Sequence, residues 1–470
     1  MAGNDVLVWI KRKRETMIQD IVSLVNIESV SIKSCNKEEP FGKGCKTVLL
    51  AAMGICRKMG FSAENHDNYC ASFLWEGSEK KELGIFGHLD VVPAGSGWTY
   101  KPFSAEVFTD IIIGRGASDN KGAVVSILYA LKYLKESGYK PKNSIRMFLG
   151  CNEECGMEDI EYYISNHKMP AFSFTPDVNF PVCYGEKGVL NITAFFNVGE
   201  SVLLDFSAGV AKNAVPGEAY AVLRMDIGDV INKLPEEMLE TYGKYVKISV
   251  KGIAAHSAFP EGSQSAEIKL AYILLSSGIL DKPACDLMKA ILCIFSDYYG
   301  KGLGVEWEDR LSGKLTHVGS MVRMDNGTCV QHINIRYNIE ADRSLLLQRI
   351  NSVLESFGFT AETVDDSPPS YFPEDHEIVQ KLTKIVNRNL GTELTPYVMG
   401  GGTYARKLKN AIGFGPGNPV NRRRFGKERG GAHQPDEYVE IYNLMQSVAI
   451  YSEAIPALDR ILTEREISIE

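Results

Sequence analysis

Apolar positions recur at three- and four-residue spacing near the start of the chain, as they do along the buried face of a helix. The spacing is regular in residues 18–27 and again in residues 47–61. Polar and charged residues occupy the positions between them, which is typical of helices packed against a core. The pattern therefore predicts that residues 1–65 are largely helical.

Short apolar runs and helical patterns alternate over the next hundred residues. The runs at 83–92 and 144–150 have the length of buried strands, whereas residues 123–138 and a stretch ending near Asn166 have a helical pattern. This alternation is typical of a largely parallel sheet with helices on its faces. The sequence thus predicts an α/β fold, in which reactive side chains gather at the carboxyl ends of the strands.

The pattern changes near residue 190, where strand-like segments become typical of an antiparallel sheet. These segments are separated by helical patterns, and a further helical pattern follows residue 377. A second region, of α+β type, is therefore expected. Its predicted strands are residues 190–198, 219–227, 245–253 and 332–342, and its predicted helices lie near 265–277 and 343–356.

Composition narrows the class of protein. A chain of 470 residues exceeds one ordinary core, so two or more domains are expected. The net charge of −8 argues against a nucleic-acid or anionic-membrane partner, and the basic run at 421–431 is expected to be a solvated loop.

The first residues lack the apolar core and cleavage site of a signal peptide, and no run is long enough to span a membrane. Ten cysteines without a C-x-x-C pair favour a reduced, cytoplasmic location.

The segment RMFLGCNEECGM, residues 146–157, places two adjacent carboxylates, Glu153 and Glu154, at the end of a predicted buried strand. Neighbouring anions repel each other and resist burial. An acidic helix N-terminus would tolerate them because of the helix dipole. A bound divalent cation would instead make their proximity favourable. One glutamate could then bind the metal while the other accepts a proton from water.

Other acidic and histidine side chains lie in similar positions. His88 and Asp90 follow a predicted strand two residues apart, so Asp90 can orient the imidazole from behind. Asp119 lies in a glycine-rich turn, Asp177 follows a proline, and His433 lies in GGAHQPDEYV. Each of these alone is commonly structural, but the set points to a metal centre. Imidazole and carboxylate ligands suit zinc, manganese or cobalt.

Six segments, in order, resemble the dinuclear metallo-amidohydrolases that include glutamate carboxypeptidase, acetylornithine deacetylase and succinyl-diaminopimelate desuccinylase. The subgroup with the greatest similarity is that of the PepV-type Xaa-His dipeptidases, which share GGTYAR (401–406) and a long lid. The matching segments are GHLDVVPAG, GRGASDNKG, GCNEECG, TPDVNFPVCYGEKG, GIAAHSAFPEG and GGAHQPDEYV.

The resemblance implies a catalytic α/β domain, residues 1–189 and 378–470, interrupted by an α+β lid domain, residues 190–377. It implies two divalent metal ions, zinc, manganese or cobalt. The implied ligands are His88 and Asp177 for one metal, Glu154 and His433 for the other, and Asp119 between the two. Asp90 would orient His88, and Glu153 would be the general base.

The lid is expected to supply further groups. By resemblance, His256 would stabilise the oxyanion, Asn213 would lie near it, and Arg336 would bind the substrate carboxylate. The family pattern is not complete, since Ser265 stands where asparagine is common and Asn338 where proline is common. Both departures lie in the lid and concern substrate preference more than metal chemistry.

These expectations favour a metal-dependent dipeptidase acting on short unblocked peptides, with a deacylase of acetylated or succinylated amino acids as the alternative. A catalytically silent relative is disfavoured because Glu153 and all the metal positions are intact. A purely structural cation site would have no use for a second free carboxylate. The oligomeric state, monomer or homodimer, is left open.

Overall fold

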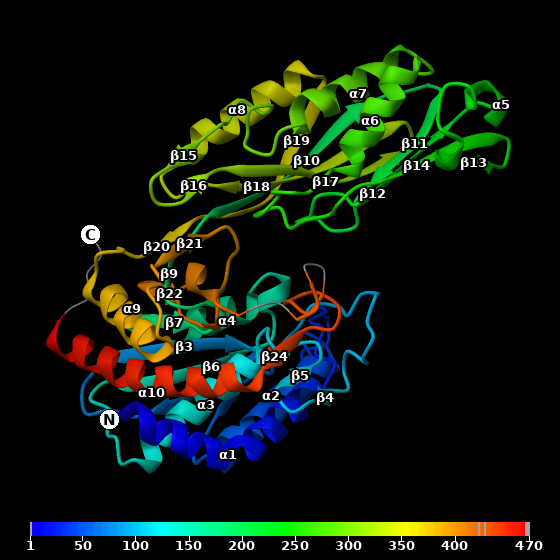
Figure 1. Ribbon diagram of the computed structural model, residues 1–470. Coiled ribbons are helices and arrows are strands. Elements are labelled where there is room, and N and C mark those ends of the chain that lie inside the picture. Colours follow the sequence, from blue (N-terminus) through cyan, green and yellow to red (C-terminus); the bar gives the residue numbers. More distant parts are fainter. Residues whose placement is uncertain (1, 422–423, 427–428, 466–470) are drawn as a thin grey trace. The chain divides into compact units, whose positions relative to one another are not determined.

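The computed structural model describes residues 2–421, 424–426 and 429–465, and the chain divides into two compact units (Figure 1). The first comprises residues 1–185, 371–397 and 402–470, and the second comprises residues 186–370 and 398–401. In the described part of the chain, no helix is both long and apolar enough to cross a membrane.

The first unit is built around a nine-stranded sheet. Its central strands β6, β3, β7 and β22 are parallel, whereas β2 and β9 pair in the antiparallel sense with β6 and β22. The strands are β1 (Glu64–His66), β2 (Cys70–Trp75), β3 (Glu82–His88), β6 (Ser144–Gly150), β7 (Phe172–Thr175), β9 (Cys183–Glu186), β20 (Ser370–Tyr371), β21 (Tyr397–Met399) and β22 (Ala411–Gly413).

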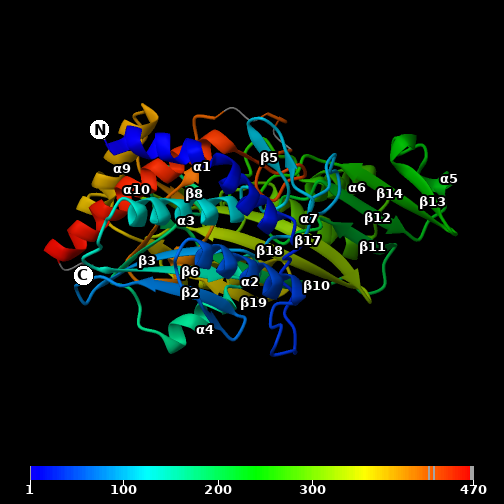
Figure 2. The same cartoon turned by 90° about the horizontal axis from the view of Figure 1, so that it is seen from below.

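Helices cover both faces of this sheet. A Cβ at Gly87 would meet Val124 of α3, whereas the neighbouring residue Phe86 packs with Ile160 of α4 and therefore points to the other face. Helices α1, α3 and α10 pack against one another, as Figure 2 shows. The helices are α1 (Ala2–Val25), α2 (Lys43–Lys58), α3 (Lys121–Glu136), α4 (Glu158–Asn166), α9 (Glu377–Leu390) and α10 (Ile441–Glu464).

Small ladders position loops around the sheet. Strand β5 pairs with β4 and β24, and β8 pairs with β23. Of the predicted basic run, residues 422–423 and 427–428 lie outside the described residues, while Arg424 forms ion pairs with Asp110 and Glu440. The short strands are β4 (Glu106–Val107), β5 (Ile111–Ile113), β8 (Val178–Asn179), β23 (Pro416–Gly417) and β24 (Tyr438–Glu440).

The second unit has an eight-stranded sheet in which every pairing is antiparallel. Helices α6, α7 and α8 contribute to its apolar core. The elements are β10 (Gly188–Asn197), β11 (Leu203–Ala208), β12 (Glu218–Leu223), α5 (Ile227–Val230), β13 (Leu239–Tyr242), β14 (Tyr245–Lys251), α6 (Ala266–Ser277), α7 (Lys282–Phe295), β15 (Glu308–Asp309), β16 (Gly313–Lys314), β17 (Thr316–Asp325), β18 (Thr328–Tyr337), α8 (Arg343–Ser356) and β19 (Phe359–Ser367).

The predicted α/β class is confirmed, but the helix predicted over residues 1–65 is absent from two segments, residues 26–42 and residues 59–65, the second of which leads into β1. Residues 26–42 are not helical, because Val30 pairs with Val91 and the Ser29 hydroxyl donates to the Leu89 carbonyl. Strands β11, β17 and β19 and helices α7 and α10 were not predicted. The helices predicted near 265–277 and 343–356 are present as α6 and α8.

Candidate metal centre

The ends of three parallel strands bring the first group of predicted residues together. In the β3–β6 ladder His88 is the register partner of Gly150, so the turn that follows Gly150 lies beside His88. That turn is a 3-10 helix, Glu153–Cys155. Strand β7 ends at Thr175 and leads directly to Asp177. The carboxyl ends of β3, β6 and β7 thus converge, as expected for an α/β sheet.

Asp119 lies between two histidines. One carboxylate oxygen, Oδ1, is 3.0 Å from Nε2 of His88, and the other, Oδ2, is 3.1 Å from Nε2 of His433. His433 Nε2 also lies 2.9 Å from Oε1 of Glu154. His88, Asp119 and Glu154 each offer a ligand atom within 4.8 Å of the others. A single carboxylate therefore faces an imidazole on each side.

A second group of three also includes His88. Ligand atoms of His88, Glu153 and Asp177 also lie within 4.8 Å of one another. Oδ2 of Asp177 is 3.6 Å from His88 Nε2, and its Oδ1 accepts a 2.7 Å hydrogen bond from the Asn120 amide. Glu153 is 9% exposed, and its Oε1 has no hydrogen-bond partner among the described residues. An orphaned buried carboxylate oxygen is costly unless something else binds it.

The electrostatics of the cluster are those of anions held too close together. Burial and the neighbouring Asp119 raise the pKa of Glu154 to about 7 and that of Asp177 to about 6. Burial, together with Asp177 and Glu154, raises the pKa of Glu153 well above its usual value. Burial alone would lower the pKa of His433, but its bonds to Asp119 and Glu154 outweigh it and raise that pKa to about 11. The cluster therefore favours positive charge among its carboxylates.

This donor set fits divalent cations. Carboxylate oxygens and imidazole nitrogens are the ligands of zinc and manganese sites, and a cation would relieve the repulsion among the carboxylates. His88, Asp119, Glu154, Asp177 and His433 all contact another member of the cluster. The structure therefore brings together every metal ligand named from the sequence.

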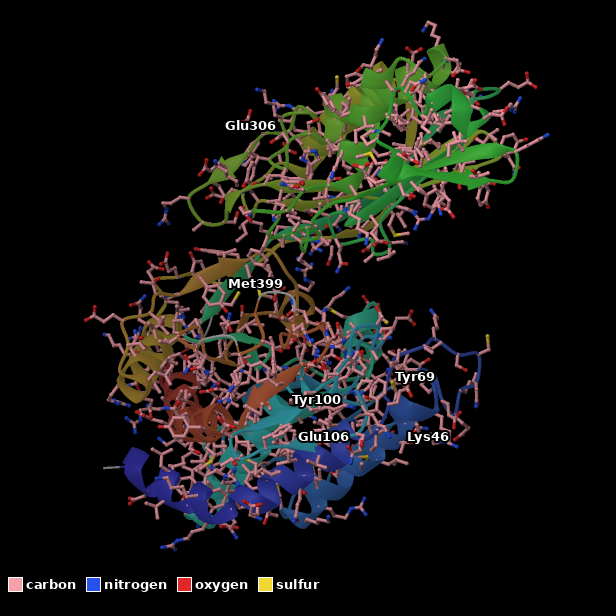
Figure 3. All side chains as sticks on the ribbon, turned by 45° about the vertical axis from the view of Figure 1, so that its right-hand side comes forward. Lys46, Tyr69, Tyr100, Glu106, Glu306 and Met399 are labelled. Carbon is pink, nitrogen blue, oxygen red and sulfur yellow. The ribbon has the colours of Figure 1, made fainter. Side chains whose placement is uncertain are left out.

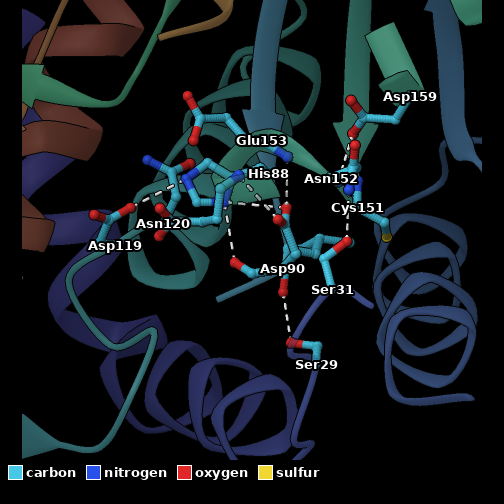
Figure 4. Close-up of polar contacts among 12 residues, drawn as sticks. Ser29, Ser31, His88, Asp90, Asp119, Asn120, Cys151, Asn152, Glu153 and Asp159 are labelled. Carbon is cyan, nitrogen blue, oxygen red and sulfur yellow. Dashed lines mark hydrogen bonds and ion pairs between the residues drawn. The ribbon is translucent and has the colours of Figure 1, made fainter. Parts of the chain in front are cut away.

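Asp90 has a wider role in the geometry than its spacing from His88 suggests. His88 Nδ1 lies 3.4 Å from the Asp90 carboxylate and 3.0 Å from its backbone carbonyl. The two carboxylate oxygens of Asp90 accept the backbone N–H groups of Glu153 and Glu154, each at 3.1 Å (Figure 4). Asp90 thus fixes the turn that bears both glutamates as well as contacting the imidazole.

The sequence did not indicate several residues that hold the turns of the site in place. Asp159 accepts the N–H groups of Cys151 and Asn152, at 2.6 and 2.8 Å, and so holds the first half of the same turn (Figure 4). Tyr404 of the GGTYAR segment donates its hydroxyl to Asp159 at 2.5 Å. Glu437 binds the loop of Asp119 in the same manner. Carboxylates that bind backbone amides have no characteristic sequence spacing. Glu437 nevertheless lies in GGAHQPDEYV, one of the six segments that resemble the family.

The predicted lid residues all lie in the second unit. His256 pairs with Ala214 as an isolated bridge, and the Asn213 carbonyl accepts the N–H of Ser257 at 2.9 Å, so Asn213 and His256 are neighbours. The Ser257 hydroxyl donates to Oδ1 of Asn334 at 2.6 Å. The same oxygen accepts Nε of Arg336 at 2.9 Å, which links Arg336 to the His256 loop.

The two departures from the family pattern have local explanations. Ser265 is the N-cap of α6, where its hydroxyl accepts the N–H of Ile268 at 3.4 Å. The Asn338 amide donates to the Ser312 hydroxyl at 3.2 Å and also to the Gly313 carbonyl. Both residues thus serve the fold of the second unit.

Known dipeptidases are similar to this chain in sequence and in fold. The chain is 32% identical over 466 residues to a putative dipeptidase of Bacillus subtilis, covering 95% of this chain and 98% of that protein. It is 30% identical to a Beta-Ala-Xaa dipeptidase of Lactobacillus delbrueckii subsp. lactis, covering 95% and 97%. The structure of human carnosine dipeptidase 1 matches with a TM-score of 0.59 at 14% identity, covering 98% and 99% of the two chains, and shows the shared fold.

A match to a family profile extends across both units. It covers residues 84–457 and therefore includes every site residue named above. The resemblance inferred from the six segments is confirmed, and so is the expectation of a peptide-bond hydrolase. The chain belongs to peptidase family M20/M25/M40.

Proposed function

We propose that this protein is a dipeptidase that uses two divalent ions, zinc, manganese or cobalt, to hydrolyse short unblocked peptides. The observation that supports this most directly is the position of Asp119, whose two oxygens lie 3.0 and 3.1 Å from His88 and His433. His88 and Asp177 would hold one ion, Glu154 and His433 the other, and Asp119 both. When bound, the ions would supply an activated water and polarise the scissile carbonyl.

The residues of the chain have distinct roles in this proposal. Glu153, buried beside the ligands, would take the proton from the attacking water and deliver it to the leaving nitrogen. Its raised pKa means that this carboxyl holds a proton more readily than an ordinary glutamate, as a proton-transfer group must. Asp90 would hold both Glu153 and His88 in place.

The second unit would bind the substrate. Residues 190–377 would act as the lid and residues 1–189 with 378–470 as the catalytic domain. His256 and the adjacent Asn213 would face the developing oxyanion, and Arg336 would bind the substrate carboxylate. Arg336 is 6% exposed, and its guanidinium is oriented by Asn334 and by the Gly400 carbonyl at 3.2 Å. The free thiols of all ten cysteines are consistent with a cytoplasmic location.

The test is hydrolysis by chelator-treated protein before and after zinc or manganese is restored. The substrates are an Xaa-His dipeptide, β-alanyl-histidine, dialanine, trialanine, N-acetyl-alanine and N-succinyl-alanine. Metal-dependent cleavage of the dipeptides alone would support the proposal. Cleavage of the acylated amino acids alone would assign the protein to the deacylases and overturn it, and so would full activity in the chelated protein.

A further inference from the structure

A buried ion pair lies next to the candidate metal centre but does not belong to it. Arg115 and Glu437 are 1% and 0% exposed, and Nη1 of Arg115 lies 2.6 Å from Oε2 of Glu437. Burying two charges costs more than packing two apolar side chains of similar size, so their stabilising effect alone is a weak reason for such a pair. Its contacts indicate a more specific role.

Glu437 binds the backbone of the loop that bears Asp119. Its second carboxylate oxygen, Oε1, accepts the N–H groups of Gly116, Ser118 and Asp119 at 3.1, 2.9 and 3.1 Å. Three amides on one oxygen leave the turn little freedom to rotate. Because the N–H of Asp119 is one of the three, the direction of its side chain depends on Glu437.

Arg115 extends the same arrangement to two other loops. Its Nη1 donates to the carbonyl of Gln434, the residue after His433, at 3.3 Å. Its Nη2 donates to the Ala94 carbonyl at 3.2 Å, four residues beyond Asp90, and its guanidinium lies 5.2 Å from the Trp98 ring centre. The pair therefore joins three loops: the loop after β3, the loop before α3 and the loop that contains His433.

Neighbouring contacts hold this junction in place. The backbone N–H of Gly114 donates to the Glu437 carbonyl at 2.9 Å. Asp436 accepts the N–H groups of Thr99 and Tyr100 at 2.8 and 3.1 Å, and Tyr100 is labelled in Figure 3. Because these contacts fix the backbone at Glu437, the charge and length of its side chain are enough to position the Asp119 loop.

We propose that Arg115 and Glu437 are positioning residues that set the geometry of Asp119 and His433 and thereby the affinity for metal. This inference rests on the proposed two-metal function. Neither side chain touches the cluster of ligand atoms directly, so neither is a catalytic residue. Outer partners that orient metal ligands typically account for 10- to 100-fold in metal affinity.

The test compares Glu437→Gln, Glu437→Asp and the double variant Arg115→Met/Glu437→Gln with the unaltered protein. Titration of the chelator-treated proteins with Mn²⁺ in a calorimeter gives the affinity without any turnover, and thermal unfolding gives the stability. We expect Glu437→Gln to bind Mn²⁺ about 10- to 100-fold more weakly, with a lower kcat at saturating metal and an unchanged KM. The double variant removes both buried charges, so it should regain thermal stability but not affinity.

Glu82→Gln is the matched control. Glu82 forms an ion pair with Arg146 at 2.7 Å, at the opposite end of strands β3 and β6 from the centre. It should lose stability without losing Mn²⁺ affinity. If Glu437→Gln bound Mn²⁺ like the unaltered protein, or if the double variant recovered affinity together with stability, the positioning role would be wrong. If the unaltered protein bound no Mn²⁺ or Zn²⁺ at all, the proposed function itself would fail.

Discussion

Each oxygen of the Asp90 carboxylate accepts one backbone N–H, that of Glu153 or that of Glu154, at 3.1 Å. An asparagine has one acceptor oxygen, and its NH₂ group would face the other N–H. Asp90→Asn should therefore lower the free energy of unfolding by about 1–3 kcal/mol, the cost of an unsatisfied buried donor, and should displace Glu153. Denaturant unfolding and turnover of the same preparation check both effects. Unchanged turnover would show that the turn keeps its shape without Asp90.

Replacing Glu153 separates metal binding from proton transfer. Glu153→Gln keeps the shape of the side chain but removes the base, so turnover should fall about 10²- to 10⁴-fold. The metal content after dialysis should stay the same, because Glu153 is not among the proposed ligands. Metal analysis and steady-state kinetics measure the two quantities. Near-normal turnover with metal still bound would exclude Glu153 as the general base.

Arg336 should discriminate between substrates that do and do not carry a free carboxylate. Arg336→Ala removes a charge-assisted hydrogen-bond donor, which is typically worth 1.5–3 kcal/mol, so kcat/KM for an unblocked dipeptide should fall roughly 10- to 100-fold. The same dipeptide as its C-terminal amide should be affected little. Equal losses on both substrates would indicate that Arg336 only supports the fold around Asn334.

His256→Ala tests the proposed oxyanion contact. If the imidazole meets the developing negative charge, kcat should fall about 10²-fold or more, while Mn²⁺ affinity stays unchanged because His256 lies outside the metal cluster. Asn213→Ala removes the second side chain proposed to face the oxyanion, while its backbone contact to Ser257 survives the change. Turnover of His256→Ala within a few-fold of normal would remove this residue from the mechanism.

A buried carboxyl in the second unit predicts a pH effect on stability. Glu267 is 0% exposed, and burial raises its pKa from 4.5 to about 8. Between pH 4.5 and about pH 8 the folded protein keeps this proton, whereas the unfolded chain has released it. The contribution to stability is therefore complete below pH 4.5 and is lost as the pH rises to about 8, at up to roughly 1.4 kcal/mol per pH unit.

Glu267→Gln has no group that titrates at this position. The free energy of unfolding of the variant, relative to that of the unaltered protein, should therefore increase from pH 5 to pH 8. Denaturant titrations at several pH values measure the difference. A constant difference across the range would show that Glu267 does not titrate there in the folded protein.

Local sequence features indicated the candidate metal centre, and the resemblance to a known family assigned a role to each residue. The adjacency of Glu153 and Glu154, the two-residue spacing of His88 and Asp90, and the glycines around Asp119 are local features, and each follows from the steric and electrostatic needs of a strand end or a turn. Because parallel strands end at one edge of a sheet, such local signals also predict that distant residues converge. The alternation of strands and helices predicted the α/β class for the same reason.

The contacts that hold these residues in place are long-range and became visible in the folded chain. Asp159 and Glu437 bind backbone amides, and an amide N–H is the same for every residue except proline, so no side-chain pattern indicates the partner. The non-helical segment at residues 26–42 depends on the pairing of Val30 with Val91, 61 positions along the chain. The sequence indicated which groups can bind a metal and that several of them follow the ends of strands. Long-range contacts decided their orientation and charge state, because burial and hydrogen bonding act only once the chain is folded.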